Sequence, residues 1–152
     1  MPANVETMFY TRVVPWHGLG VCVEETLNSE EALEKSGLDW NVVQHPIMTP
    51  VCGVVQGYKA NVRETDNRVL GVVSDRYKVV QNREAFAFTD SLLGEGVTYE
   101  TAGSLSDGRK VWILAKLPDC YVVDDEEIEP YLVFSNTHDG SGAIKVAITC
   151  VS

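Results

Sequence analysis

Short runs of alternating apolar and polar residues dominate the chain and predict a protein built mainly of β-strands. The predicted strands are Trp40–Ile47, Val51–Glu64, Val69–Ser74, Val97–Leu105, Arg109–Leu117, Ile128–Ser135 and Ala143–Thr149. Turn sequences at 65–67 and 106–108 separate neighbouring runs and predict β-hairpins. Both faces of the 109–117 strand are apolar at its centre, so we expect that strand to lie inside the sheet.

Two segments carry helix signals instead. Asn28 followed by Glu31 forms a capping box that begins one helix, and Gly37 ends it. A second helix begins at Asn82 as its N-cap and ends at Gly94. Since strands outnumber helices, we predict an α+β fold, a mainly antiparallel sheet of hairpins with two or so short helices packed on it. We expect residues 1–152 to form one domain.

Length and composition narrow the class of protein without indicating an activity. The 152 residues are 45% hydrophobic and 22% charged, which excludes a disordered tail and a coiled coil. No apolar run approaches the roughly 20 residues of a membrane helix, and residues 1–12 lack a signal-peptide pattern. We therefore expect a cytoplasmic protein with no membrane partner. Its four scattered cysteines are expected to be reduced thiols packed in the core.

The charge is unevenly distributed, and this gives the first candidate site. The net charge is −10, but residues 59–116 carry nine bases against eight acids. Two tyrosines lie among the densest bases, and proteins that bind single-stranded nucleic acid combine cations with aromatic rings in this way. The candidate nucleic-acid-binding residues are Lys59, Arg63, Arg68, Arg76, Lys78, Arg83, Tyr58 and Tyr77. The alternative is that they form ordinary solvated strand faces.

The polar segment Ser135–Ser141 is the second candidate site, and it contains Asn136, His138 and Asp139. A catalytic Ser–His–Asp triad needs its members to converge from separate elements. We therefore favour a tight turn in which Asn136 and Asp139 bond their own backbone. We predict no catalytic residues, and we favour a protein that is not an enzyme without deciding the question.

No metal or cofactor site is indicated. His17 and Cys22 form one local pair of possible ligands, whereas structural zinc sites usually combine two close pairs. The sequence also lacks the glycine-rich GxxxxGK[ST] loop that binds nucleotide phosphates. We expect neither a metal nor a cofactor.

Several segments together carry a family resemblance that extends over nearly the whole chain. They are Glu6–Phe9, Pro15–Gly20, Glu31–Leu33, Gly37–Trp40, Gly71–Tyr77, Val80–Phe86, Tyr99–Leu105, Gly108–Trp112 and Ser135–Ser141. In this order they resemble phage/plasmid-like proteins classed as a domain of unknown function. The resemblance implies a prokaryotic cytoplasm and a mobile element, and it implies no reaction. It also implies a longer protein, of which this chain is the N-terminal half; a lesser alternative is that Cys150 opens an intervening element such as an intein.

Three functional hypotheses follow. The first is binding or annealing of single-stranded DNA in mobile-element DNA metabolism, through the basic residues named above. The second is an acidic protein–protein module, a modulator of host defence or a DNA mimic. Its contact would be Asp119–Glu129, whose acidic run Asp124–Glu127 we interpret as a solvated loop. The third, an enzyme acting through Ser135–Ser141, is less favoured. A homo-oligomer is compatible with each hypothesis.

Overall fold

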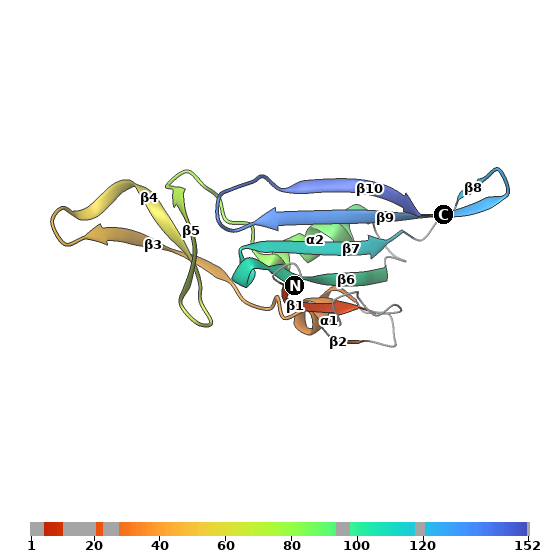
Figure 1. The fold of residues 1–152 in the computed structure, drawn as a ribbon, viewed down its shortest axis with the longest axis horizontal. Coiled ribbons are helices and arrows are strands. Elements are labelled where there is room, and N and C mark those ends of the chain that lie inside the picture. The colour runs from red at the N-terminus through yellow and green to blue at the C-terminus, as the bar shows by residue number, and fades with distance from the viewer. Residues whose placement is uncertain (1–4, 11–20, 23–27, 94–97, 118–120, 152) are drawn as a thin grey trace.

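The structure is a computed structural model, and it describes residues 5–10, 21–22, 28–93, 98–117 and 121–151. Its ten strands form a main sheet and a small sheet, and two helices pack on the main sheet (Figure 1). The main sheet has the order β10-β9-β7-β6-β1-β2, with β8 paired to β9, and the small sheet has the order β3-β4-β5. All pairs are antiparallel except β1 with β2. The predicted α+β class is confirmed, with a second sheet that was not predicted.

The elements are short, as the sequence pattern indicates. The helices are α1 (Ser29–Lys35) and α2 (Asn82–Leu93). The main-sheet strands are β1 (Val5–Tyr10), β2 (Val21–Cys22), β6 (Thr98–Leu105), β7 (Lys110–Lys116), β8 (Tyr121–Val123), β9 (Glu126–Thr137) and β10 (Lys145–Val151). The small-sheet strands are β3 (Val42–Thr49), β4 (Gly53–Arg63) and β5 (Arg68–Ser74). As predicted, β7 lies inside the main sheet, between β6 and β9.

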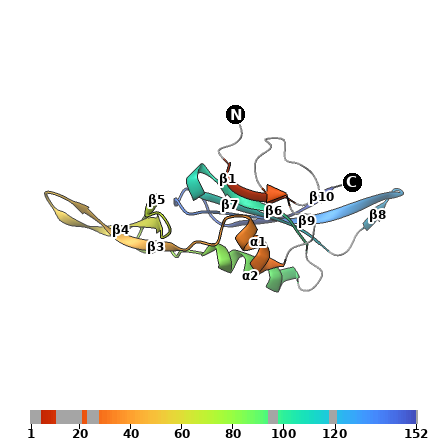
Figure 2. The same ribbon diagram turned by 90° about the horizontal axis from the view of Figure 1, so that it is seen from below.

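Both helices cover the same face of the main sheet (Figure 2). The core between the helices and the sheet is made of apolar side chains from both layers. Its largest members include Phe9, Leu38, Trp40, Phe86, Tyr99, Ile113, Leu132 and Phe134. The small sheet projects away from this body (Figure 1), so the residues that join it to the main sheet decide how it is held.

The start of each helix tests the capping predictions. At α1 the capping box is confirmed, since the Asn28 Oδ1 accepts from the Glu31 N–H at 2.8 Å. At α2 the prediction that Asn82 is the N-cap is wrong, because Asn82 is the first helical residue. The preceding residue, Gln81, donates its N–H to the Glu84 side chain at 3.0 Å. The Asn82 amide is used for tertiary contacts instead.

Two turns differ from their sequence interpretation. The β6–β7 hairpin is confirmed, but a short 3₁₀ turn, η1 (Ser106–Gly108), joins its strands, with Ser106 and Asp107 at positive φ. The acidic run was interpreted as a solvated loop, which is wrong for its second half. Asp124 and Asp125, both at positive φ, form a tight turn, and β9 begins directly after them. Two aspartates accept these angles because Asp tolerates the left-handed region better than most residues.

Two cysteines contradict the expectation of buried thiols. Cys52 and Cys150 are free thiols, as predicted, but both are exposed. Cys52 lies in the turn between β3 and β4, and Cys150 lies on the edge strand β10. Cys120 lies outside the described residues. Among the described helices, none has the length and apolar character needed to cross a membrane.

Candidate nucleic-acid interface

The β9–β10 loop packs directly on the small sheet. At Gly71 of β5, a Cβ atom would lie 2.4 Å from the Cα of Asp139. The loop is also held by its backbone, since the Asn61 Nδ2 donates to the carbonyl of His138 at 2.9 Å. The polar segment that the sequence suggested as a site is therefore the junction between the two sheets.

This close approach yields a stability prediction. The substitution Gly71→Ala places a methyl group against loop backbone, which cannot move aside as a flexible side chain can. We expect the free energy of unfolding to fall by about 2 kcal/mol, the cost typical of overpacking. Gly142→Ala is the matched control, because its Cβ would meet only ordinary contacts, the nearest at 3.7 Å. Urea denaturation of both variants measures the difference, and equal losses would contradict this account of the junction.

A pocket of about 380 Å³ opens beside the junction. Its lining residues come from the end of β5, the segment after it and the β9–β10 loop. They are Val72, Val73, Ser74, Arg76, Tyr77 and Gly140. The Tyr77 hydroxyl donates to the Thr137 carbonyl at 2.8 Å, which fixes the ring in the pocket wall. Burial raises the pKa of the Tyr77 phenol, as does the charge of Asp139, so the ring stays neutral at physiological pH.

One exposed cation lines this pocket, and three more lie near its lining residues in the strand register or in the sequence. Arg76 lines it and is exposed, and Lys59 is the strand partner of Val73, another lining residue. Lys78 and Arg83 are exposed nearby in sequence, one between β5 and α2 and the other in the first turn of α2. Within the described part of the chain, none of these four makes an ion pair.

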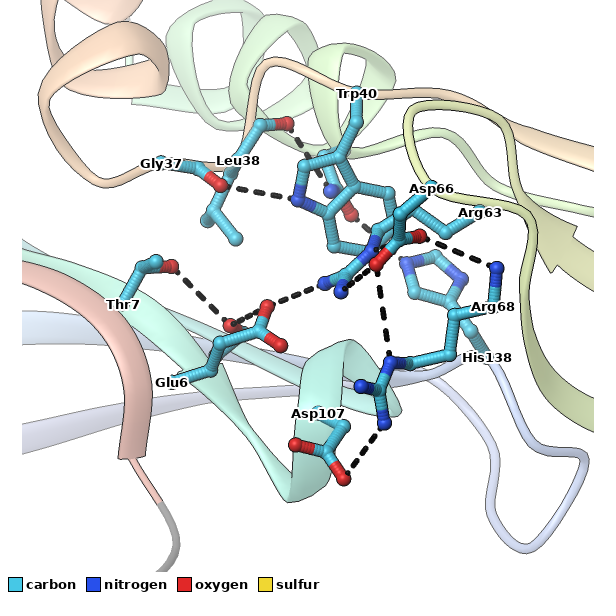
Figure 3. Close-up of polar contacts among 12 residues, drawn as sticks. Glu6, Thr7, Gly37, Leu38, Trp40, Arg63, Asp66, Arg68, Asp107 and His138 are labelled. Carbon is cyan, nitrogen blue, oxygen red and sulfur yellow. Dashed lines mark hydrogen bonds and ion pairs between the residues drawn. The ribbon is translucent and has the colours of Figure 1, made fainter.

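The other two predicted cations are already engaged (Figure 3). Arg63 is buried, bonded to Glu6 of β1 and held by two hydrogen bonds to Asp66, at 3.0 and 2.7 Å. Its guanidinium also lies 5.3 Å from the centre of the Trp40 ring. Arg68 is half-exposed and pairs with Asp107 of η1 at 3.0 Å. Both arginines therefore fasten the small sheet to the main sheet.

Arg63 and Asp66 each stabilise the ionised form of the other. Hydrogen bonding to Asp66 raises the pKa of the Arg63 guanidinium further above its ordinary value. Reciprocally, the Arg63 hydrogen bond lowers the pKa of Asp66 to about 2. Both groups are thus ionised over the whole physiological range, and Arg63 meets Glu6 of the main sheet as a full cation.

The two predicted aromatic residues lie in different places. Tyr77 is in the pocket wall, whereas Tyr58 is 54% exposed on β4. Successive strand residues point to opposite faces, so Tyr58 points away from the face that carries Lys59. Arg76 and Tyr77 therefore line the pocket together, whereas Lys59 and Tyr58 lie on opposite faces of β4 as the strand partners of two other lining residues, Val73 and Ser74.

His138 is fully buried within the junction. Its Nε2 lies 2.8 Å from the Oδ1 of Asn82, and its ring meets that of Trp40 edge-on at 5.5 Å. The Asn82 Nδ2 donates to the Leu38 carbonyl, which leaves its Oδ1 as the acceptor and so places the imidazole proton on Nε2. The Nδ1 atom has no hydrogen-bond partner among the residues that the structure describes. Burial lowers the pKa of His138 to about 4, so the ring is neutral at pH 7.

The loop does not form a catalytic triad in the described residues. His138 bonds through its ring to Asn82, and no hydrogen bond joins that ring to a serine or an aspartate. Asp139 accepts from the Ser141 N–H at 2.8 Å, the local turn that the sequence predicts. The matching prediction for Asn136 is wrong, since its amide bonds the Val80 carbonyl at 3.4 Å, because Asn136 still belongs to β9.

The described residues contain no group of three or more His, Cys, Asp or Glu side chains placed to hold a metal ion. His17 and Cys120 lie outside those residues.

Three positions of the junction carry no sequence signal that we recognised. Gln81 bonds both the N–H and the carbonyl of Val42 through its side-chain amide, at 2.7 and 2.8 Å. Asn61 and Trp40 contact His138 from β4 and from the segment before β3. Polar residues such as Gln81 and Asn61 give no period of their own, so only the tertiary structure shows their role.

Comparison with models of known protein families gives a match to part of the chain. A family model described as a domain of unknown function (DUF932) matches residues 69–152. No curated protein and no solved structure matches the chain. The matched segment contains every residue that lines the pocket, together with His138. Lys59, Arg63 and Trp40 precede it.

Proposed function

The chain belongs to the family described as a domain of unknown function (DUF932), and from this premise we propose that it binds single-stranded DNA at the pocket between the small sheet and the β9–β10 loop. The proposed setting is the DNA metabolism of a phage or plasmid in a prokaryotic cytoplasm. The family description names no activity, so the proposal depends on the surface of this chain.

The observation that supports the proposal is that Arg76, exposed and without an ion pair among the described residues, lines one pocket together with the Tyr77 ring. Proteins that bind single strands without sequence preference combine cations along the phosphates with aromatic rings on which bases stack. Here Arg76 and Lys59 would contact phosphates, and Tyr77 would present its ring to a base. Lys78 and Arg83 would extend the cationic track toward α2.

The distribution of charge favours this location over others. The chain carries −10 overall, so a polyanion is repelled from most of its surface. Four exposed acids, Asp124, Asp125, Glu126 and Glu127, lie at the β8–β9 hairpin. Figure 1 shows this hairpin at the opposite end of the molecule from the small sheet. The pocket therefore lies away from this acidic group.

Binding of a labelled 20-nucleotide oligo(dT) tests the proposal by fluorescence anisotropy at several salt concentrations. If three or four cations contact phosphates, log K should fall against log[salt] with a slope of about −2 to −3. Arg76→Glu should weaken binding about tenfold or more and make the slope shallower by about 0.7, one phosphate contact. Tyr77→Leu should weaken binding while leaving the slope unchanged, because stacking releases no counterions.

Lys35→Glu is the matched control for charge. Lys35 is exposed in the last turn of α1, and its reversal changes the net charge by the same amount as that of Arg76. Binding that is absent at low salt overturns the proposal. Binding that Lys35→Glu weakens as much as Arg76→Glu also overturns it, because the effect then depends on net charge alone.

The second candidate is an acidic protein–protein module, either a modulator of host defence or a DNA mimic. Its specific support is the β8–β9 hairpin, which holds four exposed acids at a tight turn. A basic surface of a partner protein would fit this group. Charge reversal of the four acids separates the candidates, because it should abolish capture of a partner from host lysate and leave binding of oligo(dT) intact or stronger.

A further inference from the structure

A row of three residues across the small sheet faces the β9–β10 loop. Gln44 of β3, Asn61 of β4 and Gly71 of β5 are strand partners, so they lie on the same face of the sheet. Asn61 is fully buried, and Gln44 is half-buried. Gly71 contributes no side chain, which leaves the amides of Gln44 and Asn61 as the polar groups of this row.

These two amides join the segment after β5 to the β9–β10 loop. The Gln44 Nε2 donates to the Asn61 Oδ1 at 3.1 Å and to the Tyr77 carbonyl at 3.4 Å. Because the Asn61 Oδ1 accepts that bond, the Asn61 amide turns its Nδ2 toward the loop, where it donates to the His138 carbonyl at 2.9 Å. We call these three hydrogen bonds the Gln44–Asn61 link. It connects the backbones of Tyr77 and His138, which belong to the two segments that meet at the pocket.

The Tyr77 side chain completes a closed cycle of hydrogen bonds with this link. Its hydroxyl donates at 2.8 Å to the carbonyl of Thr137, the residue before His138. Tyr77 is therefore held at two points, at its backbone carbonyl by Gln44 and at its hydroxyl by the loop, and Asn61 fixes the loop backbone one residue from that second point.

Holding the ring in place lowers the cost of binding. A side chain that is mobile in the free protein loses conformational entropy when a ligand orders it, and a side chain that is already fixed does not. Neither Gln44 nor Asn61 lines the pocket. Their effect on a ligand would therefore pass through Tyr77 and the loop.

From these contacts we infer that Gln44 and Asn61 are positioning residues of the proposed DNA site, which hold the Tyr77 ring in the orientation in which a base stacks on it. This inference rests on the proposed function for the identity of the ligand, whereas the positioning is a property of the free protein. Both residues precede the segment 69–152 that matches the family model, and every lining residue lies within it. The shape of the pocket thus depends on a part of the chain outside the family match.

The first test is the binding of the labelled oligo(dT) to Gln44→Met, which keeps the length of the side chain and removes its donor. We expect binding to weaken about two- to tenfold, the cost of ordering one side chain, with an unchanged salt slope because no cation is lost. Added to Tyr77→Leu, the same substitution should cause no further loss, since Gln44 acts through Tyr77. Gln56→Met is the matched control, at an exposed glutamine of β4, and should bind as the unchanged protein does. Circular dichroism checks that each variant is folded.

The second test needs no DNA. Burial and the charge of Asp139 raise the pKa of the Tyr77 phenol. Nuclear magnetic resonance of tyrosines labelled with carbon-13 at Cζ follows its titration, and Tyr77→Phe identifies the signal. Because loss of the link lets water reach the ring, Gln44→Met should lower the pKa of Tyr77 toward its ordinary value, and Gln56→Met should leave that pKa unchanged. Asn61→Ala, which removes the other half of the link, should act in the same direction as Gln44→Met.

The two tests separate this inference from the proposed function. A pKa of Tyr77 that stays the same in both Gln44→Met and Asn61→Ala overturns the positioning role, whether or not the chain binds DNA. An equal loss of DNA affinity from Gln44→Met in the presence and absence of Tyr77 also overturns it, because the effect is then a general loss of structure. If the unchanged protein does not bind oligo(dT), the proposed function fails, and the titration still decides whether the link positions Tyr77.

Discussion

Replacing Arg63 by alanine is expected to lower the free energy of unfolding by about 3 kcal/mol, the low end of the range for breaking a buried ion pair. The Arg63 side chain is 9% exposed, and its loss leaves the Glu6 carboxylate, 21% exposed, without this cation. Asp66 is 43% exposed and recovers more of its hydration, which is why we expect the lower figure. Urea denaturation followed by circular dichroism measures the change.

Arg68→Ala is the matched control for this effect. Arg68 also contacts Asp66 and a second carboxylate, that of Asp107, but its side chain is 45% exposed. Exposed pairs contribute at most about 1 kcal/mol, so this variant should lose less than a third as much stability. If the two variants lose equal stability, burial is not what makes the Arg63 contacts important.

The stability of the protein should fall by roughly 3 kcal/mol as the pH drops from 7 to 4, because of His138. Its folded-state pKa is about 4, against 6.5 for an ordinary histidine. Between these values the unfolded chain binds a proton that the folded protein does not, so acidification favours unfolding. Below pH 4 both states are protonated and this contribution stops changing. Denaturation midpoints measured at half-unit pH steps give the curve.

His138→Gln removes the titrating group and keeps an N–H that can donate to Asn82. The variant can start from a different stability at pH 7, but between pH 6.5 and 4 its free energy of unfolding should fall by about 3 kcal/mol less than that of the unchanged protein. Asp66 affects stability in a separate, lower pH range because its pKa is lowered. The stability that ionised Asp66 contributes is fully present above pH 3.8 and is lost as the pH falls toward 2. An unchanged slope in His138→Gln would show that other groups take up the proton.

Local signals in the sequence predicted most of the elements. The capping box at Asn28, the turn residues of the β6–β7 hairpin and the two apolar faces of β7 each act within a few residues, so they can be recognised before the fold is known. The junction between the two sheets could not be recognised in this way, because it depends on Arg63 reaching Glu6 and on Asn61 reaching the backbone of His138, contacts between segments 57 and 77 residues apart.

The candidate site, too, could be predicted only in part from the sequence. Composition identified the basic segment and the polar loop, and the structure brings Tyr77, Arg76 and the loop together at one pocket. Composition does not distinguish a cation that is free from one that is paired. Arg63 and Arg76 are equivalent in the sequence pattern. They differ in the structure because Arg63 pairs with two carboxylates, Glu6 of β1 and Asp66 of the turn after β4. Likewise, Asn82 has the residue type of an N-cap, but its amide is committed to Leu38 and His138.

The position of β1 also bears on how the chain is made. Its described antiparallel partner is β6, and the hydrogen bond from the Thr101 hydroxyl to the Phe9 carbonyl joins residues 92 positions apart. Ribosomes add about 5–20 residues per second, so roughly 5–20 s pass between the synthesis of the apolar Met8 and Phe9 and the synthesis of this partner strand. Until then they are available to chaperones and to neighbouring nascent chains. The amino-terminal strand is thus the first part of the main sheet to leave the ribosome, and it must wait for β6 before it can be incorporated.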